Sequence, residues 1–122
     1  MTINIADVLA AEDDNDIDKF VSFLAPSAVL HFGNREPIVG RAAVKAAVID
    51  FLGSIERMIH HVQQTWSVGN TLIAVVNNEY HRKDGAVVVV PNANVLTIDS
   101  NGLITEWRSY LDISPLYANR AS

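Results

Sequence analysis

The chain has 122 residues, 49% of them hydrophobic and 19% charged, which is the composition of a globular protein. Its formal net charge of −5 argues against sequence-independent binding to nucleic acid, and the lack of cysteine excludes disulfides, thiolate metal ligands and a cysteine nucleophile. Neither a basic segment before a long apolar run nor an apolar stretch of about 20 residues is present, so we expect no signal peptide and no membrane partner. We therefore expect a single domain spanning 1–122 in the cytoplasm.

The first half of the chain carries helical patterns. Residues 3–12 place Ile5, Val8 and Leu9 on one side, and the acidic run 13–16 offers a cap for a second helix. The apolar face of that second helix would be Ile17, Phe20, Val21 and Leu24, with Pro26 preventing its extension. A short strand is predicted over 28–32. After Gly40 comes a longer helix whose stripe is Val44, Ala47, Val48, Phe51, Leu52 and Ile55.

Everything after Met58 has strand character, roughly over 59–67, 71–82, 86–98 and 103–112. The breaks between these segments are Gly69-Asn70, Asp84-Gly85 and Asn101-Gly102, which favour tight turns. Helices followed by a meander of long antiparallel strands indicate the α+β class.

Two of these turns predict which side chains share a face of the sheet. A two-residue loop at Asp84-Gly85 pairs Glu79 with Val90 and Asn77 with Asn92. A loop at Asn101-Gly102 pairs Asn94 with Ser109, Leu96 with Trp107 and Asn92 with Leu111. The predicted face then holds a polar group, Asn77, Asn92, Asn94 and Ser109, with Glu79 and His81 nearer one end. It is surrounded by Val75, Val88, Val90, Leu96, Trp107 and Leu111.

A mostly apolar face with a few convergent polar groups is typical of a ligand pocket. The asparagines either satisfy one another or keep donors free for a ligand. Glu79 and His81, two residues apart on one strand, would together move a proton or activate water, or else lie solvated at the mouth. His60 and His61 point to opposite faces, so they cannot share a metal ion, and we expect none to be bound. The loop at Gly69-Asn70 puts either His60 or, with a bulge, His61 opposite Glu79.

The opposite face of the predicted sheet is also largely apolar. It holds Val76, Val87, Val89, Ala93 and Val95 with Tyr80 and Tyr110 among them. Because so large an apolar face is rarely left exposed on a monomer, we expect a homodimer that packs through it.

The segments HFGNREPIVGRAAVKAAV and DGAVVVVPNANVLTIDSNGLITEWRSYLDISPLY resemble the SnoaL-like branch of the nuclear transport factor 2-like (NTF2-like) superfamily. This resemblance implies a cone-shaped barrel, in which a strongly bent antiparallel sheet wraps around N-terminal helices, with a pocket on its concave face. Isomerases, cyclases, dehydratases, hydrolases and non-catalytic proteins all share this scaffold. The resemblance therefore specifies the fold well and the function poorly.

The resemblance also implies site residues. Against ketosteroid isomerases, Asn94 takes the position of the protonated acid, and Phe32 or His31 takes that of the base. Against scytalone dehydratase, Asp13, His61, Asn92, Asn94 and Phe32 fall at pocket positions, His81 lies near one, and the resemblance favours His61 over His60. Against limonene epoxide hydrolase, the catalytic acids and arginine are replaced by Asn77, Val75 and Ser109, which argues against epoxide opening.

The combined prediction is a cavity for a small, largely apolar, ring-containing carbonyl or hydroxyl compound. An enzyme of this kind would need no cofactor and would perform isomerisation, aldol-type cyclisation or dehydration. His61 or His81, backed by Glu79, would be the acid or base, and Asn94 with Asn92 would stabilise an oxyanion. Asp13, His31, Phe32, Asn77, Trp107, Ser109 and Leu111 are the other predicted substrate contacts. The alternative class is a non-catalytic ligand-binding or dimeric interaction protein.

Overall fold

The computed structural model describes residues 3–118 and contains helices at both ends of a largely β chain. Its elements are α1 (Ile5–Asp13), α2 (Ile17–Ser22), β1 (Leu24–Phe32), β2 (Ile38–Val39), α3 (Arg41–Gly53), β3 (Arg57–Val68), β4 (Thr71–His81), β5 (Val87–Ile98), β6 (Ile104–Tyr110) and α4 (Ser114–Tyr117). The α+β class is confirmed, whereas β2 and α4 were not predicted. Leu24 starts β1 instead of ending α2, because it pairs with Ile104 of β6.

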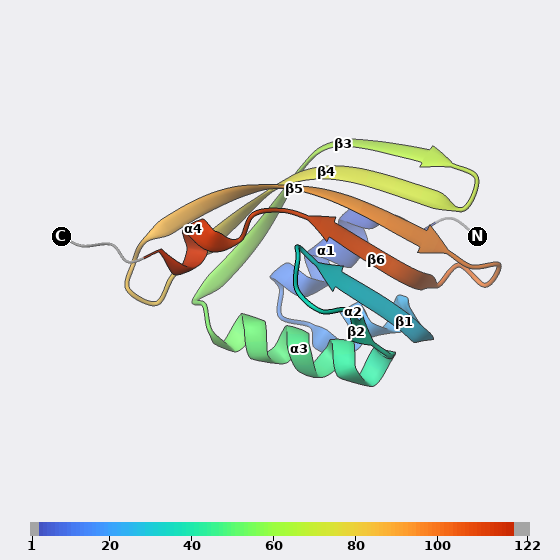
Figure 1. Cartoon of the computed structure of the whole chain (residues 1–122), viewed down its shortest axis with the longest axis horizontal. Helices are drawn as coiled ribbons and strands as arrows, with labels where there is room; N and C mark the ends of the chain where they lie inside the picture. Colours follow the sequence, from blue (N-terminus) through green and yellow to red (C-terminus); the bar gives the residue numbers. More distant parts are fainter. Residues whose placement is uncertain (1–2, 119–122) are drawn as a thin grey trace.

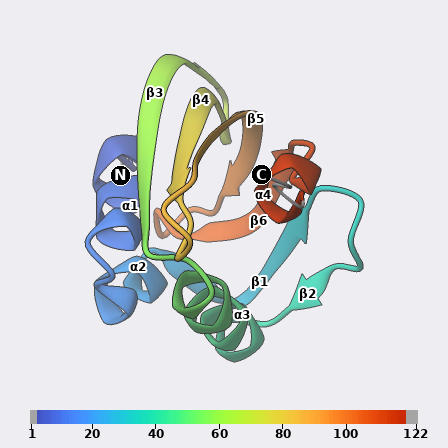
Figure 2. The same ribbon diagram turned by 90° about the vertical axis from the view of Figure 1, so that its left-hand side faces the viewer.

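The six strands form one curled sheet in the order β2-β1-β6-β5-β4-β3. β1 runs parallel to β6, and the other neighbours are antiparallel. The edge strands β2 and β3 do not pair with each other, so the sheet is curled but not closed into the predicted barrel. Figure 1 shows β3, β4 and β5 arching over the helices, and the end view in Figure 2 shows α1, α2 and α3 along the open side.

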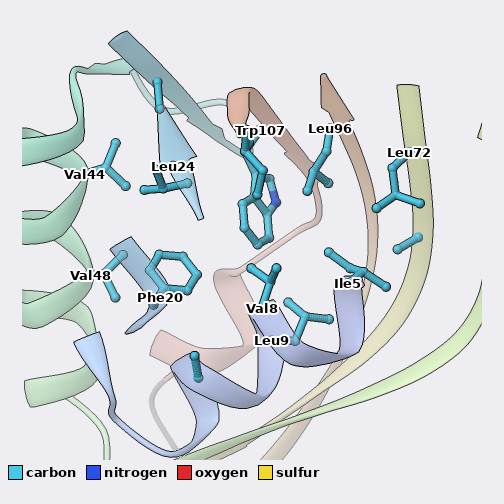
Figure 3. Packing of buried hydrophobic residues seen from close by; sticks show 14 of the residues in the cluster. Ile5, Val8, Leu9, Phe20, Leu24, Val44, Val48, Leu72, Leu96 and Trp107 are labelled. Atoms are coloured by element: carbon cyan, nitrogen blue, oxygen red, sulfur yellow. The ribbon is translucent and has the colours of Figure 1, made fainter. Parts of the chain in front are cut away.

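The concave side of the sheet is filled by apolar side chains from α1 to α3. Ile5, Val8 and Leu9 of α1 are buried, as their spacing predicts, and Asn4 caps that helix by accepting a hydrogen bond from the Ala6 amide at 2.9 Å. Figure 3 shows these residues packed towards Leu96 and Trp107 on the sheet. The acidic run provides the predicted cap for α2, since the Asp16 side chain accepts from the Lys19 amide at 3.3 Å.

The predicted register between β4 and β5 is wrong by one residue. The loop contains three residues, 83–85, because the Arg82 amide donates to the Ala86 carbonyl at 2.8 Å and Gly85 adopts a φ of +90°. Glu79 therefore pairs with Val89 instead of Val90. A one-residue shift reverses which side chains face inward, so Asn78 points into the curl and Asn77 points out.

The register between β5 and β6 agrees with the prediction at the residue pairs that contribute to the cavity wall. Asn94 pairs with Ser109 and Leu96 with Trp107. The turn again has a three-residue loop, 100–102, yet a bulge at Thr105 restores the expected pairing beyond it. The predicted partner of Asn92, Leu111, lies beyond the end of β6.

The loop between β3 and β4 is the predicted two-residue Gly69-Asn70, with Val68 opposite Thr71. A bulge at Gln63 then shifts the register, so Ile59 is the residue opposite Glu79. His60 pairs with Asn78 and His61 with Asn77. The expectation that His61 and not His60 faces the concave side is therefore wrong.

Candidate functional site

A cavity of about 320 Å³ lies between the concave face of the sheet and the helices. Most of its wall is apolar and comes from α2, β1, β2, α3, β3 and β6. The apolar lining residues are Phe20, Leu30, Phe32, Ile38, Ala47, Val48, Phe51, Met58 and Trp107. The polar lining residues are Glu12, Arg35, Glu36, His60, Asn78, Asn92, Asn94 and Ser109. An apolar chamber with few convergent polar groups is suited to a small organic molecule.

The imidazole of His60 is held in this wall by Asp13, the last residue of α1. His60 Nδ1 lies 2.5 Å from Asp13 Oδ1, and the His60 amide donates to Asp13 Oδ2 at 2.9 Å. Only 5% of the His60 side chain is exposed, against 18% for Asp13. A carboxylate can only accept, so Asp13 keeps the proton on Nδ1 and leaves Nε2 as the nitrogen that gains or loses a proton.

Glu12 places a second carboxyl group beside the same imidazole. Its Oε1 lies 3.7 Å from His60 Nε2, beyond hydrogen-bond distance, and its side chain is 13% exposed. Burial raises the pKa of Glu12, and the charge of His60 opposes that rise. Burial alone would lower the pKa of His60, but the hydrogen bond with Asp13 and the charges of Glu12 and Asp13 raise it overall. Each of these two shifts favours the protonated form of its group.

The side chain of Asn94 connects three strands at the floor of the cavity. Its Oδ1 accepts from Asn92 Nδ2 at 3.2 Å, from Trp107 Nε1 at 3.0 Å and from Ser109 Oγ at 3.0 Å. Its Nδ2 donates to the Ala74 carbonyl at 3.3 Å. The predicted cluster of Asn92, Asn94 and Ser109 therefore exists, but these hydrogen bonds occupy Asn94 within the protein. For Asn94, the first of the two alternatives that the sequence left open therefore applies, in which the amide is satisfied by neighbouring groups of the protein.

Asn78 is the amide that takes the place predicted for Asn77. It is 1% exposed and lines the cavity, and its Nδ2 donates to the Tyr80 hydroxyl at 2.9 Å. Tyr80 is fully buried on the same face, and burial raises the pKa of its hydroxyl. Tyr80 and Val76 were predicted on the opposite face, so the register shift corrects their placement too.

His61, Glu79 and His81 lie together on the outer face of the sheet, away from the cavity. Glu79 Oε1 is 3.0 Å from His61 Nε2, and Glu79 Oε2 is 2.6 Å from His81 Nε2. The hydrogen bond from His81, and then the one from His61, lower the pKa of this partly exposed carboxyl group. The proximity of Glu79 and His81 was predicted correctly, but their position in the pocket was not. Among residues 3–118, no three histidine, aspartate or glutamate side chains are arranged to hold a metal ion.

The remaining predicted contacts divide between the two faces. Phe32 lies in the cavity wall, whereas His31 points outward, with Nε2 3.4 Å from Glu106 Oε2. Of the two candidates for the base position, only Phe32 therefore reaches the cavity. Leu111 borders a separate depression near Pro91, and Asn77 is on the outer face opposite Pro91.

Glu12, His60 and Asn78 are among the cavity residues that were not predicted, although the sequence contains signals for two of these three. Glu12 continues the helical stripe of Ile5, Val8 and Leu9 at the i+7, i+4 and i+3 positions. Asn78 continues the alternating run of Leu72, Ala74, Val76 and Tyr80, which is more apolar than the other face of that strand. His60 had no comparable signal, because its orientation depends on the bulge at Gln63.

The curled sheet, the helices along its open side and the internal cavity are the features of the NTF2-like fold. The SnoaL-like domain family matches residues 5–107, and the chain belongs to this family. A search of curated proteins found no match. No helix within residues 3–118 is long and apolar enough to cross a membrane.

Solved structures with the same fold share little sequence with this chain. A Catenulispora acidiphila protein with a ketosteroid isomerase-like fold, in complex with trimethylamine, is 16% identical with a TM-score of 0.84 (93% of this chain, 89% of that one). A putative SnoaL-like polyketide cyclase from Shewanella denitrificans is 11% identical with a TM-score of 0.81 (93% and 90%). An epoxide hydrolase from M. tuberculosis, described as LEH-like, is 18% identical with a TM-score of 0.80 (93% and 83%). At these identities the likeness establishes the fold.

The first prediction concerns Asn94. Changing Asn94 to Leu removes the acceptor of three buried donors, so we expect the free energy of unfolding to fall by about 1–3 kcal/mol for each donor left without a partner. Ser109→Ala removes only one donor and leaves Asn94 with its other bonds, so its effect should be under about 1.5 kcal/mol. Urea unfolding of both variants measures the difference. An Asn94→Leu variant as stable as the parent would show that these bonds contribute nothing net.

The second prediction concerns pH. Because the pKa of His60 is raised in the folded state, its contribution to stability is fully present below its unfolded pKa of about 6.5. This contribution should be lost as the pH rises through the raised value, with a slope of at most about 1.4 kcal/mol per pH unit. His60→Gln should flatten the dependence above pH 6.5, whereas His61→Gln should keep it. Urea unfolding at a series of pH values gives both slopes.

Proposed function

We propose that this chain binds a small, largely apolar, ring-containing carbonyl or hydroxyl compound in the cavity and performs cofactor-free acid–base chemistry on it. The observation that carries this proposal is the pairing of Asp13 with His60, a buried imidazole, in the wall of an apolar chamber. Ordinary solvated histidines have neither that burial nor that orientation.

The two carboxyl groups beside His60 have different roles in this mechanism. Asp13 is a positioning residue that selects the tautomer and stabilises the imidazolium form. Glu12 lies beside His60 Nε2. Its raised pKa favours the neutral carboxylic acid, which can donate a proton close to that nitrogen. In its neutral form, with the Nδ1 proton held by Asp13, His60 uses Nε2 to remove a proton from a carbon or hydroxyl of the ligand, and the resulting imidazolium returns that proton at another position. That step serves isomerisation, aldol-type cyclisation and dehydration alike.

The apolar wall makes this proton transfer effective. Phe32, Phe51 and Trp107 leave room for a ring while keeping water away from the imidazole. Phe51 contacts the rings of Phe32 and Tyr80 at centroid distances of 5.9 and 5.8 Å, so this part of the wall is firmly packed.

The third prediction tests this function. A thermal-shift screen against polyketide, steroid and terpenoid carbonyl compounds identifies ligands, and turnover is then assayed on the hits. We expect His60→Gln to lower kcat by about 10²- to 10⁴-fold with little change in affinity, as for a lost general acid or base. Asp13→Asn should lower kcat as well and should change the pH profile.

The matched control for His60→Gln is His61→Gln, because the two histidines are adjacent on β3 and face opposite sides of the sheet. We expect the control to retain full turnover. Binding without turnover by the parent, or equal losses in both variants, would contradict a catalytic role for His60 and favour a non-catalytic ligand-binding protein.

We also propose that the chain forms a homodimer through the outer face of the sheet. The exposed apolar residues of that face include Trp66, Val87, Val89 and Tyr110, whose exposed fractions are 43%, 48%, 55% and 56%. Several charges on the face are already paired, Glu79 with its two histidines and Arg108 with Glu106 at 2.8 and 3.1 Å. Internal pairing lowers the cost of covering such a face with a second copy.

The fourth prediction tests the dimer. Light scattering at micromolar concentration should give about twice the 13.4 kDa of one chain. Ala93 lies between Val75 and Tyr110 in the pairing of this face, so Ala93→Glu should shift the mass to that of a monomer. Ile49→Glu, on the exposed side of α3, is the control and should stay dimeric. A monomeric parent would refute the proposal.

A further inference from the structure

The cavity wall contains two buried amide oxygens that have no hydrogen-bond partner within residues 3–118. They are Asn78 Oδ1 and Asn92 Oδ1, on side chains of residues that are 1% and 5% exposed. The nitrogen of each amide already donates one hydrogen bond, to the Tyr80 hydroxyl for Asn78 and to Asn94 Oδ1 for Asn92. A molecule that fills the cavity and excludes water from these oxygens must therefore donate to them, or it loses affinity.

The chemistry of its neighbours determines which atom of Asn92 is free. Trp107 Nε1 can only donate, so the Asn94 atom it contacts is an oxygen. The Ala74 carbonyl can only accept, which agrees with Asn94 Nδ2 on the other side. The Asn92 atom that contacts Asn94 Oδ1 must then be the nitrogen, and the atom left over is an acceptor. Asn78 is the adaptable member of the pair, because the Tyr80 hydroxyl can both donate and accept.

The two asparagines and His60 form a diagonal row across the concave face. His60 on β3 lies directly opposite Asn78 on β4. Asn78 is opposite Val90 on β5, so Asn92, two residues further on β5, is its diagonal neighbour at roughly 7–8 Å. A single ring can therefore reach Asn92 with one substituent while another part of it lies beside His60.

We propose that the ligand is a ring compound with at least one hydroxyl or N–H group, which donates to Asn92 Oδ1, with Asn78 as the second acceptor. This inference rests on the proposed function for the location of the ligand, and it narrows the carbonyl-or-hydroxyl class to compounds that bear a donor. Asn94 Oδ1 is not a further acceptor for the ligand, since it already accepts from three donors within the protein.

The test uses two probes that differ in one donor, 2-naphthol and 2-methoxynaphthalene, with binding to the intact chain measured by isothermal titration calorimetry. We expect 2-naphthol to bind the parent at least tenfold more tightly, which corresponds to about 1.4 kcal/mol. Asn92→Leu should reduce this preference to less than threefold, and Asn78→Leu should reduce it partly.

Asn77→Leu is the matched control, because it makes the same change at the adjacent residue on the outer face, and it should keep the full preference. Circular dichroism confirms that each variant is folded, and Asn92→Ala replaces Asn92→Leu if the latter is not. Equal or tighter binding of the methyl ether by the parent would overturn the donor inference and leave the proposed function intact. If neither probe binds, the apolar-ring cavity of the proposed function fails, and the donor inference fails with it.

Discussion

The hydrogen bonds of the Asn94 side chain connect β4, β5 and β6 beneath the cavity, among buried residues. One amide accepts from Asn92, Trp107 and Ser109 and donates to the Ala74 carbonyl. Because every one of these groups is buried, a strand that slipped would leave several of them without partners, at a cost that a domain of this size could not easily absorb. The same bonds orient Asn92 and the indole of Trp107, so the shape and polarity of the cavity floor follow from them.

The opposite wall of the cavity depends on a contact between a helix and a strand. Asp13 at the end of α1 bonds both the amide and the imidazole of His60. This contact closes the open side of the curled sheet near β3 and at the same time determines the protonation behaviour of His60. A structural attachment and a catalytic orientation are thus provided by one carboxylate, with Glu12 one residue earlier adding a second ionisable group.

The two faces of the sheet show how strongly environment separates chemically similar groups. His60 and His61 are neighbours in the chain, yet their side chains are 5% and 48% exposed. On the outer face, Glu79 has two histidine partners and a lowered pKa, as expected for an accessible ion pair. On the inner face, burial raises the pKa of Glu12. On the inner face, Glu12 and His60 are suited to proton transfer with a bound molecule. On the outer face, the paired charges of Glu79 and its histidines are suited to contact with another protein surface.

The sequence by itself determined the class of the fold, the helices α1 to α3, the four long strands and the cluster of Asn92, Asn94 and Ser109. These features depend on local periodicity and on turn residues, which act over a few positions. Only the tertiary structure decided which face of β3 and of β4 points inward. The loop between β4 and β5 has three residues instead of two. On the concave face of β4, Asn78 and Tyr80 therefore stand where Asn77, Glu79 and His81 were predicted.

A bulge at Gln63 likewise brought His60 to the cavity in place of His61. Alternation along a strand has a period of two, so one inserted residue reverses every side chain beyond it. The packing of Leu72, Val76 and Tyr80 against the helices and strands around them selected among registers that the turn residues alone left nearly equivalent. Burial of the apolar face therefore contributed more to the choice of register than the turn residues did. That choice placed His60 and Asn78 in the cavity.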